Sequence, residues 1–385
     1  MNPGKLHIEP IRAKDLYNFI RSYAAEPEGQ LISPISVYRA QAQANNPYAN
    51  EEDVGLLVAY AGKMCVGYQG LFPGLLRAKC GETKVYWCTA AYVLPEFRKR
   101  MVAIQLIKKI LSLQKDIVVT GFDGVVGSVF TGMHFRELPP LNYLRVRLER
   151  LNLPARVMGR LSQSAALAPL FPNKVGDTSG RPFWLRDGIK TAYYKLATGA
   201  LVRPNGERWR EAGPSENAFV SDTEAKKSEA FFKRGPEIIR WMLGYPWIKT
   251  RSVTTPPFYF SEACPEFRYA CFVSTDTSKE PSFAVLSLCH ENGIARIKLL
   301  DYDEREEKRG EIFALVLREA AKFRADEIEL PAEMEFEAKK LRFSSAILEH
   351  QKRRYLYHTF SPESPLATAI ANLRLNYCDG DCAFT

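Results

Sequence analysis

The sequence lacks any run of about 18 apolar residues, the length that a helix needs to cross a membrane. Residues Met1–Tyr17 also lack the apolar core of a secretory signal. Eight cysteines are scattered along the chain and none forms a Cys-x-x-Cys pair, so the pattern indicates no zinc site. We therefore expect a cytoplasmic protein with reduced thiols, no membrane span and no bound metal.

The composition is that of a globular protein, with 46% hydrophobic and 25% charged residues in a chain of 385. This length predicts two domains. We expect an N-terminal domain at 1–150, a basic connector at 151–215 and a C-terminal domain at 216–385. The formal net charge of +9 resides in the first two parts, because acidic residues outnumber basic ones in the third. The excess predicts an anionic ligand, such as CoA, a nucleotide-sugar, a phospholipid surface or tRNA, unless it serves only solubility.

One stretch, Val85–Leu113, combines the patterns of a strand, a basic loop and a helix. Val, Tyr, Trp and Thr residues before Pro95 favour a strand, which the proline ends. Isoleucines recur at helical spacing over 104–110. Between these runs lie the basic residues Arg98–Arg100, at the start of the helix, where free N–H groups and the helix dipole favour an anion. The alternative is a plain strand-to-helix connection with a solvated basic turn.

This arrangement resembles the acyl-CoA binding segment of the GNAT acyltransferases. In that family a strand splays from its neighbour, and an R/Q-x-x-G-x-G/A loop wraps the CoA pyrophosphate. Arg98 and Ala103 match the motif, whereas Met101 stands where the family usually has glycine. The resemblance implies an acetyl-CoA or acyl-CoA donor and a backbone N–H, at Tyr92 or Val93, that polarises the thioester. The donor-binding residues that it implies are Val93, Leu94, Arg98, Lys99, Arg100, Met101, Val102 and Ala103.

The sequence departs from the family at two catalytic positions. Phe130 stands where the family has a tyrosine that protonates the leaving thiolate, so we expect Tyr143, on the following strand, to supply the hydroxyl. The family often has a glutamate base where this chain has Tyr86–Cys88. A water relay, an acid from the other domain or one of Glu51–Asp53 would then be the base. Cys88 itself is interpreted as a buried strand cysteine.

The order of predicted elements in the first half repeats in the second. We therefore expect an α/β (α+β) protein of two GNAT-like domains, each a mixed central sheet flanked by helices. The corresponding loop of the second half, around Asp301–Glu311, is acidic and would repel a pyrophosphate, which assigns the donor to the first domain. A last strand is expected at 376–384, with Asp379 and Asp381 facing substrate; as metal ligands the two carboxylates would form a weak site.

Three local patterns complete the expected order of elements. The run 54–76 predicts a hairpin turned at Ala61–Lys63, with its second strand ending before Pro73. Ser33 followed by Pro34 predicts a helix start. Another helix is expected in the run 228–234.

The expected function is that of a cytoplasmic N-acyltransferase of the GNAT type, with a small-molecule amine as acceptor. The amine would belong to a sugar, a nucleotide-sugar or an amino acid. One alternative is an aminoacyl-tRNA-dependent transferase, as in the FemABX-like peptidoglycan-bridge enzymes that pair two such domains; the basic connector favours tRNA as a partner there. The other is a catalytically inactive binding or scaffold protein, which the departures from the family favour. The oligomeric state stays open.

Overall fold

The computed structural model describes residues 5–26, 29–79, 81–148, 209–213, 230–275, 282–291, 293–341 and 344–381. They form two mixed sheets flanked by helices, which confirms the α/β fold class. Contacts divide the chain into two compact units. The first gathers described residues within Met1–Asn142, Ala212–Cys271 and Lys352–Thr385, and the second those within Tyr143–Glu211 and Phe272–Gln351.

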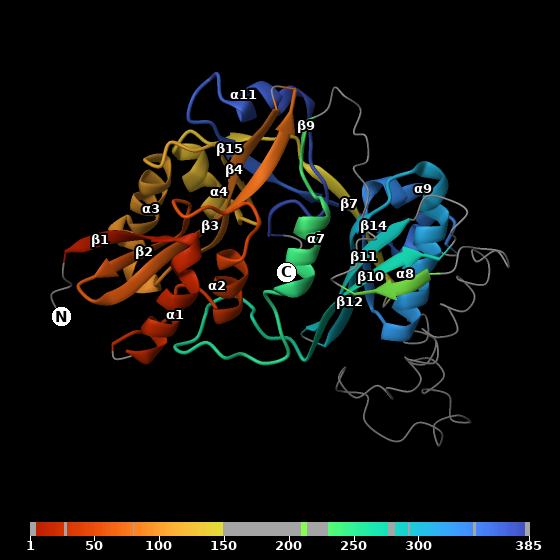
Figure 1. The fold of residues 1–385 in the computed structure, drawn as a ribbon, viewed down its shortest axis with the longest axis horizontal. Helices are drawn as coiled ribbons and strands as arrows, with labels where there is room; N and C mark the ends of the chain where they lie inside the picture. The colour runs from red at the N-terminus through yellow and green to blue at the C-terminus, as the bar shows by residue number, and fades with distance from the viewer. Residues whose placement is uncertain are drawn as a thin grey trace, which may run out of the picture. The chain divides into compact units, whose positions relative to one another are not determined.

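The first unit contains a nine-stranded sheet with the order β1-β2-β3-β4-β5-β15-β6, to which β9 adds beside β3 and β16 beside β9 (Figure 1). Neighbours along the main order are antiparallel except β4 and β5, which are parallel. The strands are β1 (Leu6–Arg12), β2 (Val54–Ala61), β3 (Met64–Ala78), β4 (Gly81–Val93), β5 (Ile117–Thr120), β6 (Arg136–Glu137), β9 (Ala230–Phe232), β15 (Tyr355–His358) and β16 (Leu373–Arg374).

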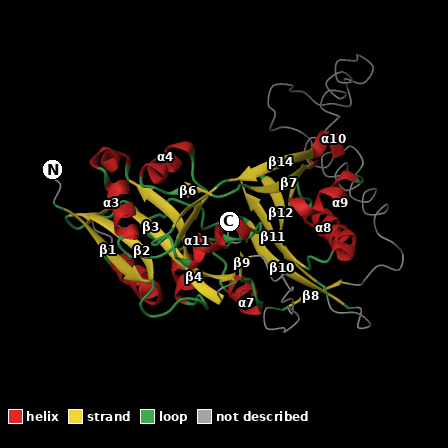
Figure 2. Ribbon diagram, turned by 90° about the horizontal axis from the view of Figure 1, so that it is seen from above, coloured by secondary structure: helices red, strands yellow, loops and turns green. Residues whose placement is uncertain are grey.

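Helices cover both faces of this sheet, with α3 and α4 on one face and α7 on the other (Figure 2). The helix expected from Ser33–Pro34 begins later, because the Ser36 side chain caps it by accepting from the Arg39 N–H. In α3 Ile107 and Ile110 are buried, Ile104 is half-buried and Lys108 is exposed, which agrees with the predicted helical spacing. The helices are α1 (Leu16–Ala25), α2 (Val37–Ala44), α3 (Val102–Leu111), α4 (Gly124–Gly132), α7 (Pro236–Gly244) and α11 (Pro365–Ala369).

Two expectations in this unit are wrong, one about where a strand ends and one about the type of an element. Strand β3 does not end before Pro73 but passes through it to Ala78. Pro73 lies opposite Tyr86, whose N–H points away from β3 to the carbonyl of Asp116 at 2.9 Å. The pair is therefore a non-hydrogen-bonded one, in which proline's missing N–H costs no bond. The run 230–232 is strand β9 rather than helix, and it pairs with β3.

The second unit is built on a seven-stranded sheet with the order β14-β7-β13-β12-β11-β10-β8. Strands β11 and β12 follow each other in the chain and pair antiparallel. The strands are β7 (Leu141–Arg147), β8 (Trp209–Ala212), β10 (Glu266–Ser274), β11 (Phe283–Glu291), β12 (Ile294–Tyr302), β13 (Glu327–Pro331) and β14 (Leu348–Arg353), and the helices are α8 (Arg309–Phe323), α9 (Glu335–Lys339) and α10 (Ser344–Ile347).

Each sheet takes a strand from the opposite half of the sequence. Strand β15, near the C-terminal end, pairs with β5 in the first unit, and β7 pairs with β13 in the second. The boundaries of the compact units therefore fall elsewhere than at 150 and 215. That the ranges 1–150 and 216–385 are two GNAT-like domains stays a prediction. Of the basic connector, only 209–213 lie among the described residues.

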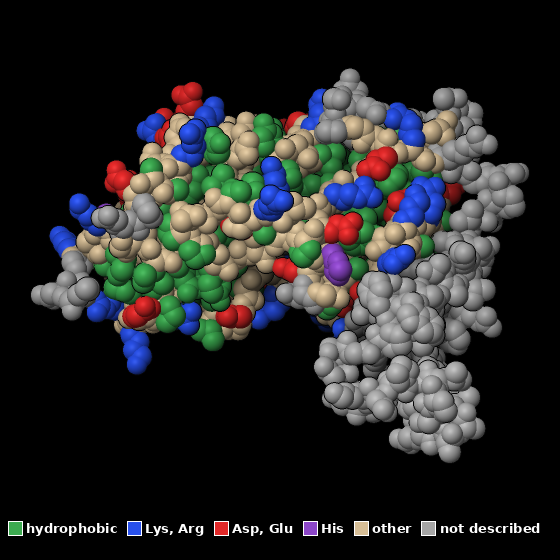
Figure 3. All heavy atoms as spheres, turned by 90° about the horizontal axis from the view of Figure 1, so that it is seen from below, with side chains coloured by type: hydrophobic (Ala, Val, Ile, Leu, Met, Phe, Trp, Pro, Cys, Tyr) green, Lys and Arg blue, Asp and Glu red, His purple; other side chains and the backbone are tan. Residues whose placement is uncertain are grey.

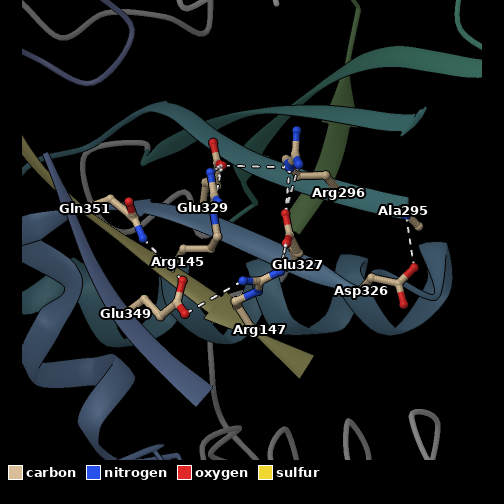
Figure 4. A network of polar contacts seen from close by, with 9 residues as sticks. All are labelled: Arg145, Arg147, Ala295, Arg296, Asp326, Glu327, Glu329, Glu349 and Gln351. Atoms are coloured by element: carbon tan, nitrogen blue, oxygen red, sulfur yellow. Dashed lines mark hydrogen bonds and ion pairs between the residues drawn. The ribbon is translucent and has the colours of Figure 1, made fainter. Parts of the chain in front are cut away.

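Charged side chains of alternating sign cross the sheet of the second unit (Figure 4). Glu329 accepts from Arg145, with an N–O distance of 2.8 Å, and lies 3.7 Å from Arg296. Arg296 also pairs with Glu327 at 2.9 Å, and Arg147 lies 3.4 Å from the same carboxylate. Both glutamates are buried. Removing Glu329 would take from Arg145 its ion-pair partner and leave Arg296 with Glu327.

We expect Glu329→Ala to lower the free energy of unfolding by about 3 kcal/mol, the lower end of the range for breaking a buried ion pair. The lower end applies because Arg145 and Arg296 keep about a quarter of their side-chain surface in solvent. Urea unfolding followed by circular dichroism measures the change. Glu335→Ala is the control, because its partners Lys339 and His350 are largely exposed and its loss should change little. Equal effects of the two variants would contradict a structural role for the network.

Candidate functional site

Strand β4 parts from β5 along its length. The parallel ladder joins Tyr86–Cys88 to Ile117–Val119, and β5 ends at Thr120. Strand β4 continues to Val93, still paired with β3. Among the described strands none pairs with Thr89–Val93 on the side of β5. The backbone polar groups that point to that side are therefore available to an extended ligand.

A β-bulge at Ala90 marks the point where the strands part. Thr89 pairs with Gly70 and Ala91 with Gln69, so Ala90 is the extra residue, and its φ of 46° is left-handed. The buried Gln69 side chain stabilises the bulge by donating to the carbonyl of Thr89 at 2.9 Å. A Cβ on Gly70 would lie 2.9 Å from the same carbonyl oxygen, so only glycine fits opposite Thr89. Such strain at a strand edge is typical of functional sites.

The two amides proposed to polarise a thioester point in opposite directions. The Leu94 N–H donates to the Val66 carbonyl at 2.9 Å, so these residues form a hydrogen-bonded pair. The next pair, Gly67 with Val93, is then non-hydrogen-bonded. The pair after that, Tyr68 with Tyr92, is hydrogen-bonded again, because the two kinds of pair alternate in an antiparallel ladder. The N–H of Val93 therefore points to the open side, whereas that of Tyr92 points to β3. The Arg98 Nε donates to the Val93 carbonyl at 3.3 Å on the open side.

The basic loop leads into a helix whose first amides are unoccupied. Residues Pro95–Arg100 form the 3₁₀ helix η2, and Met101 turns the chain with a left-handed φ of 58° before α3 begins. Met101 thus takes the conformation that favours glycine, and its side chain is 57% exposed. The first bond of α3 runs from the Gln105 N–H to the Met101 carbonyl. Within the described residues, nothing accepts from the N–H groups of 102–104, and no carboxylate lies in the first turn.

Gly67 brings the start of α3 close to the end of β4. A Cβ at this position would lie 3.0 Å from the Tyr92 carbonyl oxygen and 3.1 Å from a methyl carbon of Val102. Any larger residue would push the helix away from the strand. The predicted donor-binding residues from Val93 to Ala103 are therefore brought together on adjoining elements, while their binding role stays a prediction.

The C-terminal tail lies along β4 and brings a carboxylate to the bulge. Gly380 adopts a left-handed φ of 77°, and a Cβ there would lie 2.8 Å from the ring of Trp87. Asp381 accepts a hydrogen bond of 3.1 Å from the hydroxyl of Thr89, the residue before the bulge. The expectation of a strand at 376–384 is wrong for 376–381, the described part of that range, which forms turns. The Asp379 carboxylate stabilises them by accepting from the Asn376 N–H.

Asp381 is the site residue that sequence reasoning placed least well. The sequence marks it only as one of two carboxylates near the end of the chain, because no local pattern connects it with Thr89, almost 300 positions earlier. Among the described residues there is no group of three His, Cys, Asp or Glu side chains that could hold a metal ion. The carboxylate thus stands beside the bulge as a hydrogen-bonded group rather than as part of a ligand cluster.

The sequence also singles out Phe130, Tyr143 and Cys88. Phe130 is buried and packs edge to face against Phe135, with ring centroids 4.9 Å apart. Tyr143 lies on β7, in the other unit, opposite Pro331 of β13. Its approach to β4 therefore stays a prediction. Burial raises the pKa of the Cys88 thiol, which agrees with a structural strand cysteine.

Asp53, one of the candidate bases near the start of β2, is engaged by two other side chains. Its carboxylate accepts from the Lys84 ammonium at 2.7 Å and from the hydroxyl of Tyr86. These partners belong to the part of β4 that precedes the bulge. Asp53 therefore fixes the paired part of β4 rather than its open end.

Aromatic rings cover the open end of β4. Tyr259 stacks on Tyr92, with ring centroids 4.0 Å apart, and Tyr68 stacks on Phe258 at 5.8 Å. Tyr259 is 60% exposed. On the unit that contains the N-terminus, Figure 3 shows broad hydrophobic areas with Lys and Arg side chains around them. In the sequence, these aromatic rings over the end of β4 are indicated only by the aromatic run 258–260.

No protein-family model matches the sequence, and no curated protein matches it. Solved structures do resemble it. A GCN5-related N-acetyltransferase from Anabaena variabilis has 9% identity and a TM-score of 0.51, with 93% of this chain and 73% of that chain covered. A probable N-acyltransferase from Enterococcus faecalis has 5% identity and a TM-score of 0.50, with 92% and 73% covered. The chain thus has the fold of the GCN5-related N-acetyltransferases, as the resemblance predicted. No helix among the described residues is both long and apolar enough to span a membrane.

Proposed function

We propose that the protein is an N-acyltransferase of the GNAT type, which moves an acetyl or longer acyl group from acyl-CoA to an amine. The observation that carries the proposal is the joint geometry of two elements. The unpaired edge of β4, at Thr89–Val93, ends beside the unoccupied N-terminus of α3. The likeness of fold supports the same activity.

The donor binds along these two elements. The pantetheine arm of CoA carries amides, which pair with the free backbone groups of Thr89–Val93 as an added strand would. The pyrophosphate lies at the N–H groups of 102–104, where the helix dipole and Arg98–Arg100 favour negative charge. Met101 makes the left-handed turn before these amides without a glycine.

The chemistry requires a polarised thioester carbonyl and a base for the amine. The Val93 N–H donates to the carbonyl oxygen as negative charge develops there in the tetrahedral intermediate. Asp381 accepts the proton of the attacking amine, and its bond to Thr89 holds the carboxylate at the bulge. Collapse of the intermediate forms the amide and releases CoA as a thiolate. Tyr143 remains the proposed donor of the proton that the thiolate takes.

A thermal-shift assay with CoA, acetyl-CoA and palmitoyl-CoA tests donor binding. We expect at least one of them to raise the Tm by about 5 °C at a hundredfold excess over its Kd. Arg98→Ala should reduce the shift, because Arg98 supports both the strand end and the pyrophosphate seat. Arg21→Ala, on the exposed face of α1, is the control and should leave the shift unchanged. The proposal fails if none of the three ligands shifts the Tm.

Two further assays, of tRNA binding and of thiol release, separate the two alternatives. Steeply salt-dependent binding of tRNA without a CoA effect would favour an aminoacyl-tRNA-dependent transferase. Binding of CoA without thiol release across a panel of sugar, nucleotide-sugar and amino-acid amines would favour an inactive binding protein. Thiol release with one class of amine identifies the acceptor.

A further inference from the structure

Arg39 is a buried cation near the candidate active site. It belongs to α2 and is only 4% exposed. Its guanidinium lies over two aromatic rings, 4.6 Å from the centroid of Trp247 and 5.3 Å from that of Phe258. The loop that carries both rings packs on α2, since the Thr254 hydroxyl accepts from the Val37 N–H at 3.1 Å.

The guanidinium of Arg39 has no anion bound to it within the described part of the chain. Its Nε has no hydrogen-bond partner, and no carboxylate forms an ion pair with it. The two acidic groups whose charges reach it are Asp381 and Glu262, together with the hydroxyls of Tyr68 and Tyr269. Asp381 is held by Thr89, and Glu262 accepts from Ser252 and Thr254, so both carboxylates are oriented by other side chains.

A buried guanidinium without a hydrogen-bonded counter-ion is costly, and aromatic rings offset only part of that cost. Burial lowers the pKa of Arg39 to about 10, against the opposing effect of Asp381, so the side chain stays charged at neutral pH. Arginine is also the side chain best suited to hold a carboxylate or a phosphate by two parallel hydrogen bonds. A carboxylate or a phosphate would supply the hydrogen bond that the Arg39 Nε lacks.

We propose that Arg39 binds an anionic group of the acceptor, so that the acceptor is an amine that also carries a carboxylate or a phosphate. The inference rests on the proposed acyl transfer and names its substrate class. Phe258, which lies against Arg39, stacks on Tyr68, and the Tyr68 ring lies 6.0 Å from that of Tyr92 at the open end of β4. Asp381 contacts the bulge of the same strand. The site thus offers a carboxylate for the amine and a guanidinium for the acid of one small bipolar molecule.

Calorimetric titration with two matched pairs of probes tests this inference and separates the two sources of negative charge. The first pair is L-phenylalanine and L-phenylalaninamide, and the second is glucosamine 6-phosphate and glucosamine. We expect the acidic member of one pair to bind the wild-type protein at least tenfold more tightly than its neutral partner. Arg39→Met should abolish this difference, and Arg39→Lys should retain part of it.

The outcomes are separable from those of the proposed function, because the titrations need no donor. CoA should bind both Arg39 variants as it binds the wild type, since the donor seat is formed by β4 and α3. The inference is overturned if neither acidic probe is preferred, or if Arg39→Met keeps the preference while folded by circular dichroism. If Arg39→Met does not fold, the wild-type comparison within each pair and Arg39→Lys decide. If the wild-type protein does not bind CoA, the proposed acyltransferase function is refuted instead.

Discussion

Replacing Asp381 by asparagine should lower kcat by about 100- to 10,000-fold, the usual contribution of a positioned general base. Asparagine has nearly the same shape and can still accept the hydrogen bond from Thr89, but its amide cannot take a proton from the amine. The affinity for the acyl-CoA donor should not change. Stopped assays of thiol release, with the acceptor that the amine panel identifies, measure kcat, and calorimetry measures donor binding.

Asp379 provides the matched control, because it lies two residues away and its carboxylate caps a turn at the Asn376 N–H. Asp379→Asn should destabilise the tail without a comparable loss of kcat in the folded protein. Thr89→Val should lower kcat less than Asp381→Asn does, since the carboxylate remains but is no longer oriented. More than a tenth of the wild-type kcat in Asp381→Asn would exclude this carboxylate as the base.

Placing a glutamate at Ala103 should separate donor binding from stability. Ala103 is exposed in the first turn of α3, where a negative charge stabilises a helix by about 0.3–1 kcal/mol. The same charge would stand beside the bound pyrophosphate, and repulsion there should weaken CoA binding about 100-fold. We therefore expect an unchanged or higher Tm without ligand and a much smaller ligand-induced shift.

Gln105→Glu supplies the comparison, because Gln105 is exposed on the same helix but lies beyond its first amides. Its carboxylate should reduce CoA affinity only slightly. Titration of both variants with CoA at two salt concentrations measures the electrostatic part, which should shrink at high salt for Ala103→Glu. Equal affinities of Ala103→Glu and the wild type would show that the pyrophosphate lies elsewhere.

The sequence carried the local part of this site and missed the distant part. The strand, the basic turn and α3 follow from residues close together in the chain, so propensity and spacing predict them. The bulge at Ala90 depends on Gln69 and Gly70 of the neighbouring strand, which no pattern within β4 reveals. Asp381 comes next to the bulge, and Arg39 comes next to the rings of Trp247 and Phe258, only through tertiary contacts.

The same reasoning explains the errors in the fold. Pro73 predicts a strand end, but β3 places it at a non-hydrogen-bonded position where no donor is needed. The run 230–232 carries no helix or strand signal strong enough to decide, and its pairing with β3 determines its state. Such choices depend on partners far along the chain, and a single sequence does not identify them.

Strand β15 has a consequence for how the protein is made. It fills the place between β5 and β6, yet it leaves the ribosome more than 200 residues after both of them. Until then, the hydrogen-bonding edge of β5 is exposed in the nascent chain, and exposed edges invite pairing with other chains. The first sheet therefore cannot be completed during synthesis until β15 has emerged.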